Sequence, residues 1–415
     1  MLMLSVQLFS QLPDTTRKQL QEPGPEIDSL QRQMLRLEAE LQELRRQVAD
    51  GTDMERLLSI FEDEDLESGS FDNRSRRKQV DALLEAITNR PGRLVFNGNV
   101  TAIAQVANQN DDTKSFATGS FDIFAATSFG KGTLLFIDLE AIGGDGPDQA
   151  FPTFSGLNGD AGNYQSEDGI DRVNVLEAWG EFNLFQEAVT ITAGKIDLTN
   201  YFDNNASAND ETMQFISGSF INSSAFAVPS NSPGVTLRTK FFDRYHFKFG
   251  LVSYDNAGGD IFTDLYKIAS VGWTFAPGSD FEANIRVYGY ELPGADDTYG
   301  YGASFDKVIF GAYSLFGRYG RNLDSVAGHW PLRSAWSAGT RFEKTIAEKV
   351  FSIGAAYGEN MPYEAGLETE QLIEVFIRRQ VNTWAHLSPH FQYVWNAAGT
   401  REKIIAGGLR VQFNF

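Results

Sequence analysis

Ile405-Ala-Gly-Gly-Leu-Arg-Val-Gln-Phe-Asn-Phe415 alternates between two kinds of residue. One face would hold Ile405, Gly407, Leu409, Val411, Phe413 and Phe415, and the other would hold the small and polar residues between them. A period of two with one apolar face predicts a half-buried strand. An aromatic residue at the end of such a strand is typical of membrane barrels, where an aromatic girdle meets the interface and lipid covers the outward face. The alternative is an edge strand of a soluble domain.

The same alternation recurs from about residue 93 onward. Leu135, Ile137 and Leu139, for example, alternate with Asp138 and Glu140. Further segments of this kind lie near 188–194, 234–242, 245–254, 266–275, 281–291, 299–307, 310–320, 335–343, 350–358, 370–380 and 384–395. With sixteen strands over residues 93–415, each strand together with its connection takes about twenty residues. This length leaves room for the strands of roughly ten residues that cross a membrane. We therefore predict an all-β fold, an antiparallel transmembrane barrel of sixteen strands, with fourteen or eighteen left open.

The cost of charge in lipid predicts which face of each strand points inward. A Lys or Arg on the lipid face at the bilayer midplane costs about 2–4 kcal/mol. We therefore expect most basic residues of the strand patterns to face the lumen or lie near the interfaces: Arg238, Lys240, Lys248, Arg286, Arg318, Arg341, Arg378 and Arg410. A soluble sandwich would expose these charges instead, but at this size it would need two cores and a visible boundary, and the sequence shows none.

Composition excludes several classes of function. The chain has 415 residues, with 33 Phe, 14 Tyr and 39 Gly but no Cys, so thiolate chemistry and Cys-ligated zinc are excluded. No apolar run reaches the roughly 18 residues of a transmembrane helix. A formal net charge of −20 argues against nucleic acid as a partner. His246, His329, His386 and His390 show no metal-like or nucleophile-like spacing. We expect neither an enzyme nor a cofactor or metal.

A different pattern precedes the barrel. Residues 25–50 carry a 3-4-3-4 apolar seam typical of a coiled coil: Ile27, Leu30, Met34, Leu37, Leu41, Leu44 and Val48. The seam fits a coiled coil of two helices as well as one of three. A single amphipathic helix packed on its own domain is the alternative. We expect residues 1–24 to form a leader or linker without a complete signal peptide, and 51–92 a linker with one short amphipathic helix. The barrel would then span 93–415.

The longest interruption between strands runs from Gly194 to Pro233. Loops longer than about 12–15 residues inside a compact domain are usually functional or disordered. Phe202, Phe215 and Phe220 are apolar anchors that argue against disorder, whereas the middle of the segment is dense in Asp, Asn and Glu. We therefore expect the segment to be ordered and to carry selectivity.

This segment resembles the characteristic motif of the carbohydrate-selective porin family of bacterial outer membranes. The matching positions are Gly194, Lys195 and Asp197, then Tyr201 to Asn205, then Ala208 to Thr212. The resemblance covers roughly 93–415 and implies a trimer of sixteen-stranded barrels, each narrowed by in-folded loops. The terminal Phe413 and Phe415 resemble the signal read by the outer-membrane assembly machinery. The heptads ahead of the barrel make the layout similar to cyanobacterial porins, which place a peptidoglycan-binding module and a coiled coil there.

The pore can be assigned candidate residues on this basis. A narrow hydrated pore selects by width, hydrogen-bonding groups and charge. We predict a constriction in which acidic and amide loop residues face a wall of arginines: Asp203, Asn205, Asp210 and Glu211 against Arg238, Arg286, Arg318 and Arg341. Trp179 and Tyr288 are predicted to stack on sugar rings. Structural salt bridges for the arginines, and a turn or helix start at Asp210-Glu211, are the alternatives.

The predicted protein is an outer-membrane porin that lets small hydrophilic solutes diffuse passively, with sugars as the favoured class. Its partners would be outer-membrane lipid, the permeating solutes and two further copies of the chain, with the coiled coil in the periplasm. The alternative is a general or inorganic-ion porin that also tethers the outer membrane to the cell wall, with peptidoglycan or another wall component as the partner.

Overall fold

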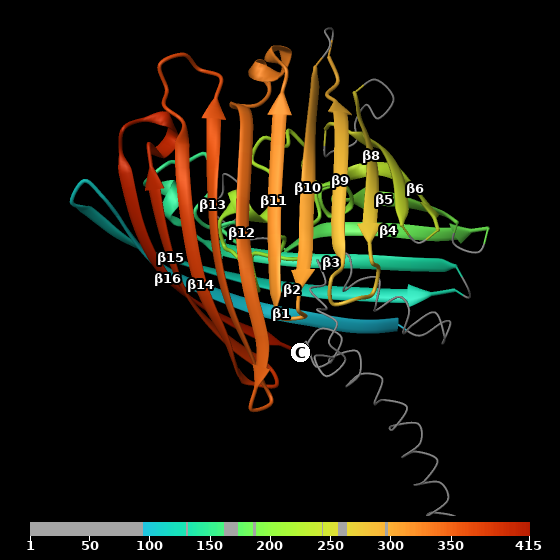
Figure 1. Ribbon diagram of the computed structural model, residues 1–415, viewed down its shortest axis with the longest axis horizontal. Coiled ribbons are helices and arrows are strands. Elements are labelled where there is room, and N and C mark those ends of the chain that lie inside the picture. Colours follow the sequence, from blue (N-terminus) through green and yellow to red (C-terminus); the bar gives the residue numbers. More distant parts are fainter. Residues whose placement is uncertain are drawn as a thin grey trace, which may run out of the picture. The chain divides into compact units, whose positions relative to one another are not determined.

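The computed structural model describes residues 94–129, 132–161, 173–185, 188–242, 244–255, 264–294 and 298–415. The predicted leader, coiled coil and linker at 1–24, 25–50 and 51–92 lie outside these residues. The described chain forms one closed antiparallel barrel of sixteen strands, as the alternation predicted (Figure 1).

The strands follow one another around the barrel in chain order. Their bounds are β1 Leu94–Gln109, β2 Asp112–Ser128, β3 Thr133–Gly144, β4 Val173–Leu184, β5 Val189–Ile196, β6 Ser232–Phe241, β7 Tyr245–Ser253, β8 Leu265–Phe275, β9 Ala283–Glu291, β10 Tyr299–Ile309, β11 Tyr313–Asn322, β12 Leu332–Ile346, β13 Lys349–Pro362, β14 Glu370–Asn382, β15 Ala385–Trp395 and β16 Lys403–Asn414. Short 3₁₀ turns lie in the connections: η2 Pro147–Gln149, η3 Asp324–Gly328 and η4 Ala397–Gly399.

The C-terminal strand closes the barrel against β1. Val100 lies opposite Phe413 in this pair. Beyond the ladder, Gly98 and Phe415 exchange two backbone hydrogen bonds of 3.0 Å, and the Phe415 ring stacks on Phe121. Connections after even-numbered strands lie at one end of the barrel, the turn end, where β1 begins and β16 ends. Connections after odd-numbered strands lie at the other end, the loop end, and include the long ones after β3 and β5.

Side chains alternate between a buried lumen face and an exposed outer face. On β16, Leu409 is 43% exposed whereas the neighbouring Arg410 is 1% exposed. Arg318, Arg341 and Arg378 are likewise buried, as the charge argument predicted. The exposed face of the strands is rich in aromatic and aliphatic residues such as Phe247, Val271, Val287, Tyr301, Phe391 and Ile405. This arrangement fits a barrel that has lipid outside and polar groups inside.

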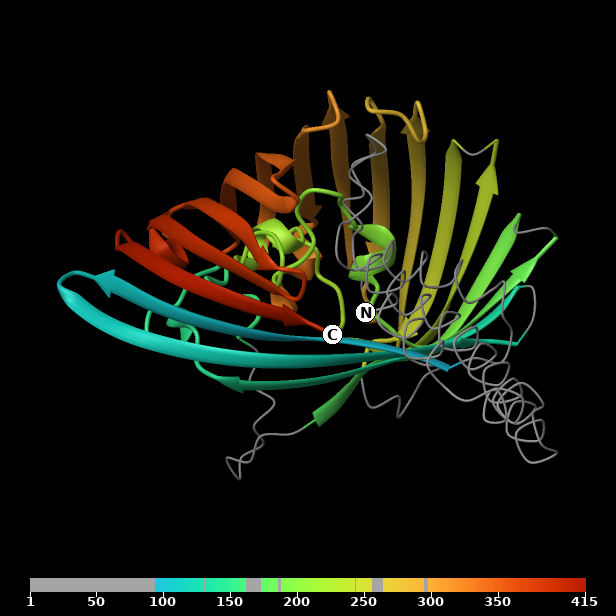
Figure 2. The same ribbon diagram turned by 90° about the horizontal axis from the view of Figure 1, so that it is seen from below.

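The two long connections fold back into the lumen. Residues 197–231, between β5 and β6, include the short helices α6 Thr199–Phe202 and α7 Gly218–Ile221, and we call them the in-folded segment. Figure 2 shows these helices inside the ring of strands. Residues 145–161, after β3, pack beside them: the amide of Ser219 donates to the Ser155 carbonyl at 2.9 Å. Among the described residues, no helix has the length and apolar character needed to span a membrane.

Candidate functional site

A buried ion pair fixes the first half of the in-folded segment to β11. Arg318 Nε lies 3.0 Å from Asp203 Oδ2, and both side chains are fully buried. The same guanidinium donates to the Asp203 carbonyl at 3.0 Å and to the Phe220 carbonyl at 2.7 Å. Asp203 also accepts from the Ser223 amide at 2.7 Å and from the Tyr288 hydroxyl at 3.2 Å. Because a buried charge needs a full set of partners, this network determines where the segment crosses the lumen.

An aromatic contact and a second carboxylate fix the other half. The Phe215 ring is fully buried, and its centroid lies 5.0 Å from Phe376, 5.3 Å from Phe220 and 5.6 Å from Phe316. Next to it, Glu374 on β14 accepts the backbone amides of Ile216 and Ser217 at 2.8 and 2.9 Å. The local sequence therefore combines one apolar anchor with backbone donors that a wall carboxylate satisfies.

The turn at Asp210–Met213 is held from two sides. Asp210 Oδ1 accepts the amides of Thr212 and Met213 at 2.8 and 3.0 Å, as short acidic side chains do at turns. From β16, Arg410 donates to the Glu211 carbonyl at 2.6 Å and Gln412 donates to Thr212 Oγ1 at 3.0 Å. The Asp210 and Glu211 side chains are thereby held at a fixed place in the lumen.

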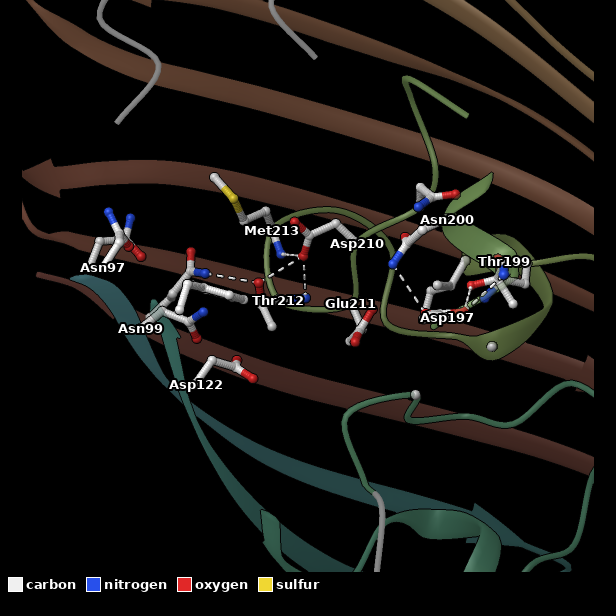
Figure 3. Close-up of a pocket in the computed structure, with 18 residues that line it drawn as sticks. Asn97, Asn99, Asp122, Asp197, Thr199, Asn200, Asp210, Glu211, Thr212 and Met213 are labelled. Carbon is white, nitrogen blue, oxygen red and sulfur yellow. Dashed lines mark hydrogen bonds between the residues drawn. The ribbon is translucent and has the colours of Figure 1, made fainter. Parts of the chain in front are cut away.

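These residues border a cavity of 230 Å³ that we call the acidic cavity. Figure 3 shows the turn at Asp210–Met213 between Asn97 and Asn99 on one side and Asp197 and Asn200 on the other. Its lining includes four carboxylates and no Lys or Arg. The polar lining side chains are Asn97, Asn99, Asp122, Asp197, Thr199, Asn200, Asn209, Asp210, Glu211, Thr212, Asn222, Gln412 and Asn414. Such a surface offers many oxygen acceptors and several amide donors to a hydrated solute.

The barrel wall beside the acidic cavity is also acidic. The buried positions of β2 to β5 hold no Lys or Arg but hold Asp122, Asp138, Glu140, Glu177 and Glu181. Asp160, in the connection after β3, adds a further carboxyl group to this region. Its burial, and then the nearby Glu211, Asp122 and Glu140, raise the pKa of that carboxyl well above 3.8. Negative charge near the cavity therefore falls as the pH drops through a range above that ordinary value.

A second cavity, of 280 Å³, lies against β6 to β9 and has the opposite charge. Arg238, Lys240, Lys248 and Arg286 line it, together with Asn204 of the in-folded segment. We call it the basic cavity. Arg286 makes a 2.6 Å ion pair with Asp306 Oδ2 at its edge.

The predicted constriction is only partly assembled as expected. Of the predicted acid–arginine contacts, the structure brings together Asp203 and Arg318, as a buried structural pair. Asn205 is buried too, donating to the Phe305 carbonyl at 2.9 Å. The other predicted residues lie apart from one another. Asp210 and Glu211 line the acidic cavity, whereas Arg238 and Arg286 line the basic cavity. Arg341 forms an ion pair with Glu343, with 3.4 Å between Nη1 and Oε2. The structure thus brings together one of the expected acid–arginine pairs and distributes the other candidates over two cavities and a separate pair.

The two predicted stacking residues have covered rings. Trp179 is 4% exposed, stacks on Phe136 with 4.9 Å between ring centroids, and donates to Glu177. Tyr288 is 2% exposed, packs on Phe226 at 4.7 Å and donates to Asp203. Neither ring offers a free face to a sugar in this structure, so both act as packing residues.

Sequence reasoning missed the wall residues of the acidic cavity. Asn97, Asn99, Asp122, Gln412 and Asn414 come from β1, β2 and β16, far from the in-folded segment in sequence. Their alternation with apolar neighbours showed that they face inward, but not at which height. Within the described part of the chain, no group of three or more His, Asp or Glu residues could hold a metal ion.

Comparison with known proteins finds similarity to porins. Residues 347–415 match the model of the family described as carbohydrate-selective porin, OprB family. A curated protein of Aquifex aeolicus (strain VF5), described as uncharacterized, is 27% identical over 297 residues, which is 72% of this chain and 84% of that protein.

Two solved structures of Pseudomonas putida OprB share the fold. The high-pH structure superposes with a TM-score of 0.61 at 12% identity, covering 81% of this chain and 96% of that one. The low-pH structure gives 0.52 at 12% identity, covering 77% and 92%. The resemblance to carbohydrate-selective porins is thereby confirmed. The family match covers the C-terminal strands, and the structural likeness shows that the chain has the barrel fold of these porins.

Proposed function

We propose that this chain is an outer-membrane porin through which small hydrophilic solutes, sugars above all, diffuse past the in-folded segment. The observation that carries the proposal is the acidic cavity, where amide and carboxylate side chains of the segment face those of β1, β2 and β16. A polyhydroxylated solute can exchange its water for these donors and acceptors at little net cost. The turn end, with its short connections, would face the periplasm.

Single-channel conductance in planar bilayers, titrated with glucose and maltose-series sugars, tests the proposal. We expect sugar-dependent block at millimolar concentration. Asp210→Asn should weaken it roughly fivefold, the equivalent of one hydrogen bond of about 1 kcal/mol. Asp324→Asn, which removes the same charge from an exposed loop residue, is the matched control. Folded protein that forms no channels would refute the porin proposal.

The same cavity favours a second candidate, a porin for inorganic cations. Its lining has four carboxylates and no basic side chain, and charges that line a pore act strongly on permeating ions. In a KCl gradient, we expect the reversal potential to show a preference for K⁺ over Cl⁻. The preference should decrease in an Asp122→Asn/Glu211→Gln variant. It should also decrease as the pH falls and Asp160, whose carboxyl pKa is raised by burial, takes up a proton. Stable conductance without sugar block would favour this candidate.

Lipid contact of the outer face can be tested independently of transport. Leu409 lies in the middle of β16 and Val381 lies beside the turn after β14, and both are exposed. Leu409→Arg should lower the free energy of unfolding in lipid vesicles by about 2–4 kcal/mol, and Val381→Arg by only about 0–1, because the cost depends on depth. Urea titration of vesicle-inserted protein measures both. Equal costs would contradict the membrane placement.

The remaining sequence predictions extend this proposal. A trimer, a coiled coil at 25–50 that reaches a cell-wall partner, and Phe413 and Phe415 as the assembly signal are all consistent with an outer-membrane porin. The Phe415 contacts with Gly98 and Phe121 give the C-terminus a structural role in closure as well.

A further inference from the structure

The basic cavity lies on the turn-end side of the in-folded segment. Arg238 and Lys240 are close to the end of β6. Lys248 lies directly opposite Arg238 on β7, and Arg286 lies two strands further around the barrel, on β9. Lys248 Nζ donates to the Tyr201 carbonyl of α6, and Asn204 completes the lining. A solute in the turn-end half of the lumen can therefore meet the floor of the segment and four basic side chains together.

The pairing of the strands puts like charges opposite each other. Arg238 is the direct partner of Lys248 in the β6–β7 ladder. Like charges at directly opposed positions destabilise a sheet. Among the described residues, the carboxylates at the cavity are Glu282 in the lining and Asp306, which pairs with Arg286, whereas four basic residues line it. The described lining therefore has more basic than acidic side chains, and this balance suits an anion.

The donors and the space suit an oxyanion. Arginine presents several N–H donors in a planar fork that matches phosphate and carboxylate oxygens, and lysine adds a compact charge. Gly272 lies opposite both His246 and Arg286 in the ladders, so no side chain fills the position between them. A Cβ there would make ordinary van der Waals contacts, 3.6 Å from His246 Cβ and from the Ile285 carbonyl oxygen and 3.7 Å from Arg286 Cγ, so a side chain can be placed at this position. At about 30 Å³ per water, 280 Å³ exceeds what a small oxyanion needs.

We propose that the basic cavity binds a small oxyanion, with the phosphate group of inorganic phosphate or of a phosphorylated sugar as the ligand chemistry. The site is distinct from the acidic cavity, which has the opposite charge and suits neutral or cationic solutes. It extends the proposed function, because a porin with this site would hold anionic permeants on the turn-end side of the in-folded segment.

Isothermal titration calorimetry of the purified barrel in detergent, at constant ionic strength, tests the site. The probes are inorganic phosphate, glucose 6-phosphate and glucose. We expect both phosphates to bind, and we expect any heat from glucose, which would come from the acidic cavity, to be the same in the parent and in the variants of this site. An Arg238→Gln/Lys240→Gln variant should weaken phosphate binding roughly tenfold or more, because hydrogen bonds to charged groups are lost. Gly272→Leu should weaken it comparably by filling the cavity while leaving the charge unchanged.

Lys267→Gln is the matched control, because Lys267 is exposed on the neighbouring β8 and pairs with Glu291. It should bind phosphate like the parent, and circular dichroism should show that every variant is folded. Binding of glucose 6-phosphate but not inorganic phosphate would assign the site to phosphorylated sugars. Absence of phosphate binding by the folded parent, or unchanged binding by the charge and cavity variants, would overturn the proposal. Conductance reports on the porin function separately: phosphate binding without channels would refute only that function.

Discussion

Arg318→Ala is expected to release the in-folded segment from the wall and raise the single-channel conductance. The substitution leaves the Asp203 carboxylate buried without its ion-pair partner and removes the donor to the Phe220 carbonyl. Breaking one partner of a buried pair costs about 3–5 kcal/mol. The barrel ladders do not depend on this contact, so the cost should appear as local opening of residues 197–231. Their amides should exchange with deuterium faster by about two orders of magnitude or more.

Two variants separate this effect from general damage. Arg333→Ala removes a partly exposed arginine that lies 3.8 Å from Asp324, and exposed pairs are worth about 0–1 kcal/mol, so exchange and conductance should stay at parental values. Asp203→Asn/Arg318→Gln removes both charges and should recover part of the lost protection, because no unpaired charge is left buried. If Arg318→Ala left both exchange and conductance unchanged, the ion pair would not be what holds the segment.

Most of the fold could be predicted from the sequence because a barrel strand shows its two environments in its own alternation. Leu409 and Arg410 show this: one faces out and the other in, as their chemistry required. Strand ends were less clear. The expected strand at 310–320 begins at Tyr313 in the structure, because Phe310 and Gly311 take positive φ in a tight turn. An apolar Phe in that turn continues the alternation and hides the boundary.

The candidate site was less predictable because alternation shows direction but not position around the barrel. Asp203 and Arg318 meet across a sequence separation of 115 residues, and the closure of sixteen strands determines which wall the segment reaches. The structure places Asp210 and Glu211 at the acidic cavity. The cavity wall beside them proved to hold Asn99 and Asp122, and the arginine that contacts Glu211 is Arg410. Arg238 and Arg286 lie on strands that border the other cavity.

Phe215→Ala should open the in-folded segment, with the largest effect in its second half. Removal of a fully buried Phe costs about 3–5 kcal/mol, because burial is lost and a cavity remains among Phe220, Phe316 and Phe376. Hydrogen exchange should rise most at Ile216 and Ser217, whose amides bond to Glu374. Phe182→Ala, which removes the same ring from the exposed outer face, should leave exchange in the segment unchanged.

Benzene provides a sharper test, because dry apolar cavities of this kind bind it. Added benzene should slow exchange at Ile216 and Ser217 in Phe215→Ala and have no effect on the parent. Since Arg318 and Phe215 fix the same segment, the double variant should open it by less than the sum of the two single effects. Once either anchor has let the segment leave the wall, the other has less native contact to lose. Full additivity would mean that the two halves open independently and that each half alone sets part of the pore width.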